Sequence, residues 1–347
     1  MIAVASDKFK GTLTALEACQ AIADGLRRAG ISEEIRLWPM ADGGEGTAEI
    51  LRATATDDAD FRVMAASESV GMGCFDLETK RLIDRSSYAF GEAIVRELNE
   101  LDDRGTLLIG IGGTAVSDGG AGLLQALGYR FYGADRRLIS EPITPRLLKD
   151  VRRINPPKDN YLIQRLKERG LLLCDVRASL LPESRTPLSA LDFARQKGGD
   201  AHQIGIITEA LNRLRSIFDV RPTLVDGAGG GIGYALGAVI GCRAMPGGDI
   251  ILERYLKINP SPRLIVTGEG QVDSQSYGGK VVDAVNRYGR FNSVEVVTVG
   301  GRVVGRPPYP KVVAASKEDE PLPTTKEEAR HRIVEAVATY FSDRASE

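Results

Sequence analysis

Stretches of aliphatic and β-branched residues alternate along the chain with stretches whose apolar positions recur at helical spacing. The first apolar stretch, Ile2–Ser6, predicts a strand, and the pattern that follows predicts an amphipathic helix to about Ala29. The order of strand, loop and helix returns at four later strands, Ile35–Pro39, Thr106–Ile111, Leu264–Thr267 and Val294–Val299. Strands that alternate with helices of this length are typical of parallel β-α-β units, so the pattern predicts an α/β fold.

Two helix starts carry a specific local signal. Thr14 and Glu17 have the spacing of a capping box, and so do Thr325 and Glu328 near the C-terminal end. In such a box the Thr side chain accepts a hydrogen bond from a free backbone N–H of the first helical turn. We therefore expect one helix to begin after Thr14 and a final helix to begin after Thr325.

The pattern of apolar and polar residues changes in the middle of the chain. Residues 61–85 show short apolar runs without helical spacing and predict an antiparallel element, and residues 140–170 are rich in proline and charge. We predict a two-lobed molecule in which residues 1–60 and 261–347 form a Rossmann-like parallel sheet domain. Residues 61–260 are expected to form a second α/β domain that is inserted into the first.

Charge and composition narrow the possible partners. The 347 residues include 45 Lys and Arg against 47 Asp and Glu, a formal net charge of −2, so the sequence has neither a basic nucleic-acid footprint nor an acidic tail. A small-molecule substrate is expected, with no nucleic acid and no membrane as partner, and a homodimer stays open. The longest uncharged stretch, Gly227–Cys242, is too short to span a bilayer and predicts a buried helix behind a glycine loop.

Cysteine and histidine usage excludes several kinds of site. The four cysteines are scattered singly, which argues against a disulfide framework or a zinc ribbon and favours a reducing, cytoplasmic location. Only His202 and His331 are present, and each is expected at the surface among polar neighbours. The N-terminal residues lack the basic region of a signal peptide.

Glycine makes up about 11% of the chain, against about 7% in average proteins. The glycines gather in five loops, most of them directly after predicted strands, at residues 42–46, 110–115, 118–122, 227–233 and 268–270. In parallel α/β sheets the ligand crevice lies at the carboxyl ends of the strands, where backbone N–H groups can bind phosphate. Each loop alone could be a tight turn, but together they indicate a large anionic ligand.

Acidic and basic residues accompany these loops. Asp42, Asp118, Asp175, Glu269 and Asp273 could bridge a hard cation such as Mg²⁺ or accept a proton from a hydroxyl group. The lysines nearest the loops are Lys10, Lys197 and Lys280. No Walker loop occurs, which excludes a P-loop kinase. Gly110, Gly112 and Ala115 match a variant dinucleotide fingerprint, but the second glycine loop that follows does not suit a Rossmann site, so an oxidoreductase is disfavoured.

At these loops the sequence resembles the type I glycerate kinase family. The resemblance lies in the motifs SDKFKGTLT at residues 6–14, ADGGEGT at 41–47, GIGGTAVSDGGAG at 110–122, GAGGGIG at 227–233 and GEGQVDSQSYGGK at 268–280. These motifs occur in family order and span most of the chain. The resemblance implies an enzyme that phosphorylates D-glycerate with ATP and Mg²⁺, with 2-phosphoglycerate as the expected product.

The resemblance also implies roles for individual residues. The expected catalytic residues are Lys10, Asp42, Asp175 and Asp273, and the expected substrate-binding residues are Asp7, Lys10, Lys197 and Lys280. Phosphate binding is expected at Gly110, Gly112, Gly113, Thr114, Asp118, Gly119, Gly229, Gly230, Gly268 and Glu269. Asp118 and Asp273 are the expected ligands of Mg²⁺.

Several substrate-side motifs depart from the family pattern. Ala178 and Ser179 stand where the family has Asn-Pro, and Gln271 stands where it has arginine. Two alternatives therefore stay open beside D-glycerate phosphorylation. One is a kinase for another small hydroxy acid or polyol, and the other is a nucleotide-binding pseudoenzyme without turnover.

Overall fold

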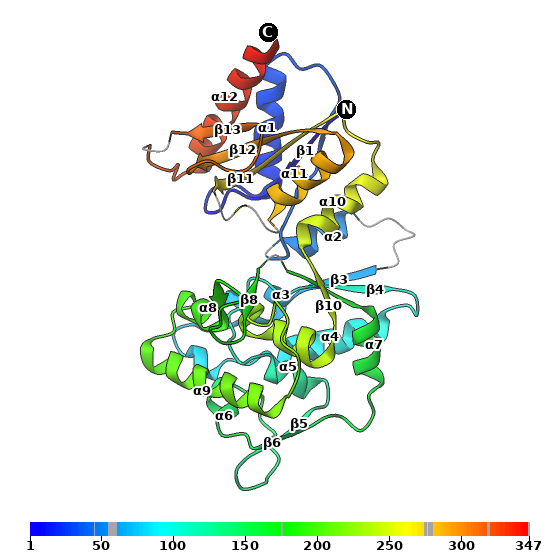
Figure 1. Ribbon diagram of the computed structural model, residues 1–347, viewed down its shortest axis with the longest axis vertical. Helices are drawn as coiled ribbons and strands as arrows, with labels where there is room; N and C mark the ends of the chain where they lie inside the picture. Colours follow the sequence, from blue (N-terminus) through cyan, green and yellow to red (C-terminus); the bar gives the residue numbers. More distant parts are fainter. Residues whose placement is uncertain are drawn as a thin grey trace. The chain divides into compact units, whose positions relative to one another are not determined.

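The computed structural model describes residues 1–44, 46–54, 61–174, 176–273, 276, 280–317 and 320–345, which form two compact α/β units (Figure 1). Unit 1 comprises Met1–Asp42, Glu49–Thr54 and Pro246–Glu347, and unit 2 comprises Gly43–Ala48 and Ala55–Met245. Unit 1 thus contains both ends of the chain, and unit 2 is inserted into it. The second junction lies at Pro246 and not at residue 261, because α10 (Gly247–Ile258) packs on α11 (Val281–Asn292) of unit 1.

Unit 1 is built on a five-stranded parallel sheet with the order β13-β12-β11-β1-β2. Besides α10 and α11, its elements are β1 (Ile2–Ser6), α1 (Ala15–Arg28), β2 (Ile35–Leu37), α2 (Thr47–Ala53, in unit 1 from Glu49 on), β11 (Leu264–Val272), β12 (Glu295–Val303), β13 (Val312–Ser316) and α12 (Lys326–Ala345). In order of appearance within the unit, the strands follow the pattern 2-1-3-4-5. This is the flavodoxin-like doubly wound order, and its switch point lies between β1 and β11.

Helices cover both faces of the unit 1 sheet. α1 and α12 lie side by side on one face and bury the side chains of Ile2, Val4 and Val266, while α11 packs on the opposite face, where Asn286 donates to the Thr298 hydroxyl at 3.0 Å (Figure 1). Both predicted helix starts are confirmed. Thr14 and Glu17 form the full capping box of α1, and the Thr325 hydroxyl accepts from the Glu328 N–H at the start of α12.

Beneath α10, Trp38 is almost completely buried and stacks on Tyr255, with ring centroids 5.4 Å apart and planes 4° from parallel. Stacked rings of this kind bury a large apolar area. Trp38 is the only tryptophan in the chain. The stack attaches α10 to the segment that follows β2, which explains why α10 belongs to unit 1.

Unit 2 contains a four-stranded parallel sheet with the order β10-β7-β4-β3. Its strands are β3 (Phe61–Ala65), β4 (Thr106–Gly110), β5 (Arg130–Tyr132), β6 (Arg153–Asn155), β7 (Gly170–Leu173), β8 (Ala178–Ser179), β9 (Leu188–Ser189) and β10 (Arg243–Met245). Its helices and helical turns are α3 (Ala66–Val70), η1 (Met72–Cys74), η2 (Leu82–Asp84), α4 (Tyr88–Glu100), α5 (Ala121–Ala126), α6 (Pro145–Leu148), α7 (Tyr161–Arg169), α8 (Ala190–Gln196), α9 (Ala201–Ile217), η3 (Ala228–Gly230) and η4 (Tyr234–Ile240).

Two sequence-based expectations about strands are wrong. The segment 61–85 is not antiparallel, since β3 pairs in parallel with β4 and is followed by α3 and two short helical turns. The 13-residue helix α4 provides the crossover that parallel pairing requires. Gly268, Glu269 and Gly270 do not form a loop after a strand, because β11 continues through them to Val272 and pairs with β12.

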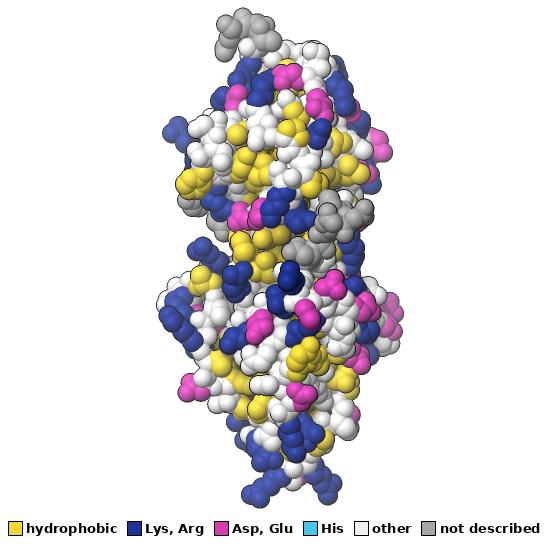
Figure 2. Space-filling model, turned by 90° about the vertical axis from the view of Figure 1, so that its right-hand side faces the viewer, with side chains coloured by type: hydrophobic (Ala, Val, Ile, Leu, Met, Phe, Trp, Pro, Cys, Tyr) yellow, Lys and Arg dark blue, Asp and Glu magenta, His cyan; other side chains and the backbone are white. Residues whose placement is uncertain are grey.

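The expected buried helix after the glycine run is present, but it is a π-helix and not an α-helix. Gly227–Gly231 forms a tight turn, and Tyr234–Ile240 continues as a π-helical segment whose residues are mostly buried. Among the described residues, no helix combines the length and the apolar character that a membrane crossing needs. The end of unit 2 that carries β5 and β6 is rich in Lys and Arg, whereas charges of both signs are interspersed over the rest of the face in Figure 2.

The glycine run of unit 2 allows backbone to pack against backbone. Gly230 has φ +71°, and a Cβ atom on it would lie 2.0 Å from the Val116 carbonyl oxygen. Gly231 would similarly meet the Gly119 Cα at 2.4 Å. The Gly119 N–H donates to the Gly230 carbonyl at 3.1 Å, which joins the two glycine loops directly. Side chains at these positions would force the two loops apart.

We expect Gly230→Ala to lower the free energy of unfolding by about 3 kcal/mol, because it adds a backbone clash to the strain of positive φ. Gly198→Ala is the matched control. Gly198 also has positive φ, but open space surrounds its Cα, so the control should cost only about 1 kcal/mol. Urea unfolding of both variants measures the difference, and equal losses would show that the close contact does not matter.

Candidate functional site

A cleft of about 320 Å³ lies at the carboxyl ends of the strands of unit 1. Its walls come from the loop Asp7–Lys10 after β1, from Asp42 after β2, and from Glu269–Gln271 at the end of β11. The cleft therefore lies at the switch point between β1 and β11, where ligands bind in doubly wound sheets. This position was not deducible from any single motif, since it depends on which strands are neighbours.

Glycines let the loop after β1 approach the sheet closely. A Cβ atom on Gly301 would lie 2.5 Å from the Gly270 carbonyl oxygen, and one on Gly270 would lie 3.3 Å from the Lys10 nitrogen. Phe9 is buried beside these glycines, and its N–H and carbonyl are both hydrogen-bonded to Leu13. This packing fixes the backbone of Lys10, whose exposed side chain lines the cleft.

Three acidic side chains, Asp7, Asp42 and Glu269, line the cleft. Burial, and next the negative charge of Asp42, raise the pKa of Asp7 to about 7, although its carboxylate accepts a hydrogen bond from the Lys8 N–H at 2.7 Å. Glu269 is 7% exposed, and burial raises its pKa against the opposing effects of the Ser276 hydroxyl and Lys280. At neutral pH the cleft therefore holds a carboxyl group, that of Asp7, which can accept or keep a proton.

Lysines balance part of this negative charge. The Lys280 ammonium lies 3.4 Å from Glu269 Oε2, and Lys280 is also the residue that precedes α11. Lys8 and Lys10 also line the cleft. Gln271, which stands in place of the family's arginine, donates from its amide to Asp273 at 2.7 Å. The cleft thus combines proton acceptors with ammonium groups that suit a small anionic molecule.

The described residues contain no group of three His, Cys, Asp or Glu side chains arranged to hold a metal ion. Mg²⁺ in kinases is held mainly by phosphates and water with one or two protein carboxylates. Asp273 fits such a role, since it is partly exposed next to the cleft residues Glu269 and Gln271. Asp118 is fully buried, and its carboxylate accepts four hydrogen bonds within unit 2, from Ser87 N and Oγ, Gly120 N and Gly122 N.

The glycine loops of unit 2 form the second candidate region. The run after β4 passes through Gly113, which has φ +69°, to Thr114, whose hydroxyl accepts a hydrogen bond from Lys197 at 3.2 Å. Other glycines of these loops contact neighbouring backbone. A Cβ on Gly112 would lie 2.7 Å from Gly44 Cα, and one on Gly229 would lie 2.6 Å from the Ile111 carbonyl oxygen. Packing within unit 2 therefore explains why glycine is needed at these positions, whether or not a ligand binds there.

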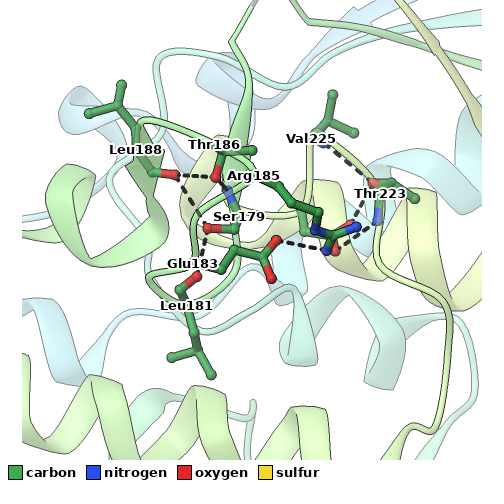
Figure 3. Close-up of polar contacts among 9 residues, drawn as sticks. Ser179, Leu181, Glu183, Arg185, Thr186, Leu188, Thr223 and Val225 are labelled. Atoms are coloured by element: carbon green, nitrogen blue, oxygen red, sulfur yellow. Dashed lines mark hydrogen bonds and ion pairs between the residues drawn. The ribbon is translucent and has the colours of Figure 1, made fainter.

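The segment that departs from the family's Asn-Pro pair is also internal to unit 2 (Figure 3). Ser179 is 2% exposed, and its hydroxyl donates to the Leu181 carbonyl at 2.6 Å, while its N–H donates to the Thr186 hydroxyl at 3.0 Å. Ala178 exchanges backbone hydrogen bonds with Leu224 and Gly227. The residues that replace the family's Asn-Pro pair therefore hold the backbone at Gly227, where the glycine run begins.

The predicted site residues divide between the two units. Unit 1 contains Asp7, Lys10, Asp42, Gly268, Glu269, Asp273 and Lys280, and unit 2 contains Gly110, Gly112, Gly113, Thr114, Asp118, Gly119, Lys197, Gly229 and Gly230. Asp175 lies outside the described residues. Sequence reasoning missed Arg85 and Ser87. Arg85 donates to the Ala115 carbonyl and Ser87 donates to the Asp118 carboxylate, both in the glycine-rich segment after β4. Neither belongs to a glycine-rich motif, so no local signal marked them.

The raised pKa of Asp7 predicts a pH-dependent stability. The folded protein keeps a proton on Asp7 that the unfolded chain releases near pH 4, so this stabilisation is complete in acid and is lost as the pH rises to about 7. Asp7→Asn stays neutral, so its stability relative to the parent should increase by about 2 kcal/mol between pH 5 and pH 8. Urea unfolding at both pH values checks this.

Asp343→Asn on the exposed side of α12 is the control, and its effect should be the same at both pH values. The expectation is contradicted if the free energy of unfolding changes with pH in the same way in the parent protein and in Asp7→Asn.

Comparison with known proteins supports the same assignment as the motifs. A model of the glycerate kinase family matches residues 2–68 and 54–312. The chain is 28% identical to the glycerate kinase of Halalkalibacterium halodurans and 29% identical to the glycerate 2-kinase of Escherichia coli K12, in each case over 86% of this chain, and over 85% and 84% of the relatives.

A solved crystal structure from Salmonella typhimurium LT2, of a protein for which the function of glycerate kinase 2 has been suggested, matches the fold with a TM-score of 0.76. The two chains are 26% identical, and the match covers 99% of this chain and 97% of the other. The chain belongs to the glycerate kinase family, and with it to the phosphotransferases that use an alcohol group as acceptor.

Proposed function

We propose that this protein transfers the γ-phosphoryl group of ATP to a hydroxyl group of D-glycerate, with Mg²⁺ as cofactor and 2-phosphoglycerate as product. The observation that carries the proposal is the cleft of unit 1, where desolvated carboxyl groups and lysine ammonium groups share a space at the switch point of the sheet. D-Glycerate has a carboxylate for the ammonium groups and hydroxyl groups for the carboxylates. Its small size also suits a cleft of about 320 Å³.

Each cleft residue then has a chemical role. Lys10 and Lys280 bind the glycerate carboxylate, and Asp7 and Asp42 orient the acceptor hydroxyl. As the new oxygen–phosphorus bond forms and the bond to the ADP oxygen breaks, the hydroxyl proton passes to the Asp7–Asp42 pair. A carboxyl group with a pKa near 7 suits this step, because it releases the proton again at neutral pH.

The nucleotide phosphates are assigned to the glycine loops of unit 2, around Gly113 and Thr114. Phosphoryl transfer depends mainly on positioning and on neutralising charge. When bound, Mg²⁺ would supply much of that neutralisation, with Asp273 as a protein ligand. Asp118 is better assigned to the loop itself, because its four hydrogen bonds hold Ser87, Gly120 and Gly122. The four cysteines are scattered singly along the sequence, which supports a cytoplasmic location.

A second candidate is a kinase for another small hydroxy acid or polyol. The observation that favours it is Gln271, a neutral amide on the wall of the cleft where the family has an arginine. The loss of one cation weakens the preference for an acceptor with a carboxylate. The candidates therefore differ in how strongly the enzyme prefers D-glycerate over uncharged alcohols.

The proposal predicts that ADP release with MgATP is at least about 10-fold more efficient with D-glycerate than with L-glycerate, glycolate or glycerol. A coupled assay of ADP measures kcat/KM for the panel, and addition of enolase without a mutase detects 2-phosphoglycerate directly. Chelation of Mg²⁺ should abolish turnover. A preference for glycerol would favour the second candidate. Thermal stabilisation by MgATP, about 2.7 kcal/mol at 100 times its Kd, without any ADP release would indicate a pseudoenzyme.

Lys10 gives a test at a single side chain. Lys10→Ala should lower kcat/KM for D-glycerate by at least about 10-fold, which corresponds to about 1.4 kcal/mol, because the cleft loses a carboxylate partner. The side chain is exposed, so the stability should change by less than about 0.5 kcal/mol. Lys257→Ala on the exposed surface of α10 is the control and should retain full activity. If Lys10→Ala turns over D-glycerate at the parent rate, Lys10 does not bind the substrate.

A further inference from the structure

A second charged cluster lies in unit 2, around the loop Thr114–Val116. Lys197 directly follows α8, and its ammonium donates to the Val116 carbonyl at 2.7 Å and to the Thr114 hydroxyl at 3.2 Å. Arg85 is 5% exposed and donates to the Ala115 carbonyl at 3.2 Å and to the Lys80 carbonyl. Two cations thus bind three consecutive residues of one loop, and every partner named here is a neutral oxygen.

Negative charge near this loop is limited. Among the described residues, Lys197 and Arg85 make no ion pair with a carboxylate within 4.0 Å. Asp118 is the nearby acid, and its carboxylate already accepts four hydrogen bonds from Ser87, Gly120 and Gly122. Among the described residues near this loop, Lys197 and Arg85 can carry two positive charges when Lys197 is protonated, and Asp118 can supply one negative charge. Buried charges without a partner are costly, so this arrangement favours an added anion.

The surroundings of the ammonium suit phosphate in particular. A lysine ammonium has three N–H donors, and protein oxygens occupy two of them on Lys197. Thr114 Oγ1 accepts from Lys197, so its own hydrogen is available to a ligand. A Cβ atom on Gly230 would lie 3.0 Å from the ammonium, which shows that this cation lies against glycine backbone. Glycine turns of this kind expose the N–H groups that bind phosphate.

We propose that Lys197 binds a phosphate group of the nucleotide at the Thr114–Val116 loop. The inference rests on the proposed function and deepens it, because it moves Lys197 from the substrate to the nucleotide. It also makes nucleotide binding sensitive to pH around neutrality through this one side chain. Arg85 acts here as a positioning residue for the loop.

Electrostatics add a consequence, which is that Lys197 takes up a proton when the anion binds. Burial lowers the pKa of Lys197 to about 7, Asp118 opposes this shift, and Arg85 adds to it. At pH 7.5 only about a quarter of the molecules then carry the charged ammonium. A bound phosphate restores a pKa well above 7. Wild-type protein should therefore take up roughly three quarters of a proton per ADP at pH 7.5, and only about 0.1 at pH 6.0.

Calorimetric titration of the full chain with ADP, in Pipes and in Tris at each pH, measures this number, because the two buffers differ in ionisation enthalpy. Lys197→Arg keeps the charge but cannot titrate, so it corrects for protons on the nucleotide itself. We expect the wild-type excess over Lys197→Arg to be about 0.7 proton at pH 7.5 and to disappear at pH 6.0. Lys197→Met should bind ADP at least about 10-fold more weakly, and the exposed control Lys158→Met should bind like wild type.

The outcomes separate this inference from the function beneath it. ADP binding that is equally tight in wild type and Lys197→Met overturns the inference and leaves the proposed function intact. Equal proton uptake by wild type and Lys197→Arg overturns the pH dependence of nucleotide binding. Weaker binding of D-glycerate but not of ADP by Lys197→Met also overturns the inference and returns Lys197 to the substrate. Absence of ADP binding by wild type overturns both. If Lys197→Met does not fold, the comparison of wild type with Lys197→Arg still decides.

Discussion

Direct packing of backbone against backbone is the constraint on which both candidate regions depend. In unit 1, Gly270 and Gly301 allow the loop after β1 to rest on the sheet, and this fixes Lys10 at the cleft. In unit 2, Gly230 lies against Val116 in the same way. A loop held by such contacts needs few side chains of its own for support, as with Phe9 in unit 1 and Asp118 in unit 2. Its other polar groups can then serve a ligand.

The same close packing removes water from charged side chains, and its effect has opposite sign in the two units. In unit 1 burial raises the pKa of Asp7, and in unit 2 it lowers the pKa of Lys197, so both groups titrate near neutrality. A carboxyl group of this kind can accept a proton from an alcohol, and an amine of this kind gains a proton when an anion arrives. In the proposed reaction the first event would serve the acceptor and the second the phosphate donor.

Local patterns in the sequence were sufficient for the fold class and for the starts of two helices, but not for the strand partners or for the role of each glycine motif. The capping boxes at Thr14 and Thr325 are short-range signals, and both predicted helices begin there. Strand partners are long-range, so the parallel pairing of β3 and the continuation of β11 through Gly268 were mispredicted. The glycine motifs also could not distinguish a ligand loop from a packed turn, because both require the absence of a side chain.

The sequence also did not show which charged side chains are buried. Asp118 looked like a metal ligand because it stands among glycines, whereas its four hydrogen-bond donors come partly from Ser87, 31 residues away. Arg85 has no motif around it, and only the fold brings it to the Thr114–Val116 loop. The family resemblance pointed to these loops, but the protonation state of each ionisable group depends on neighbours that are distant in the chain.

The stack of Trp38 on Tyr255 gives the molecule an intrinsic optical label in one of its two units. Unit 2 contains no tryptophan, so fluorescence excited at 295 nm originates entirely from unit 1. Trp38 lies four residues before Asp42, on the same chain segment that leads into the cleft. Changes in its emission therefore report separately on the unit that carries the candidate cleft, while circular dichroism reports on both units together.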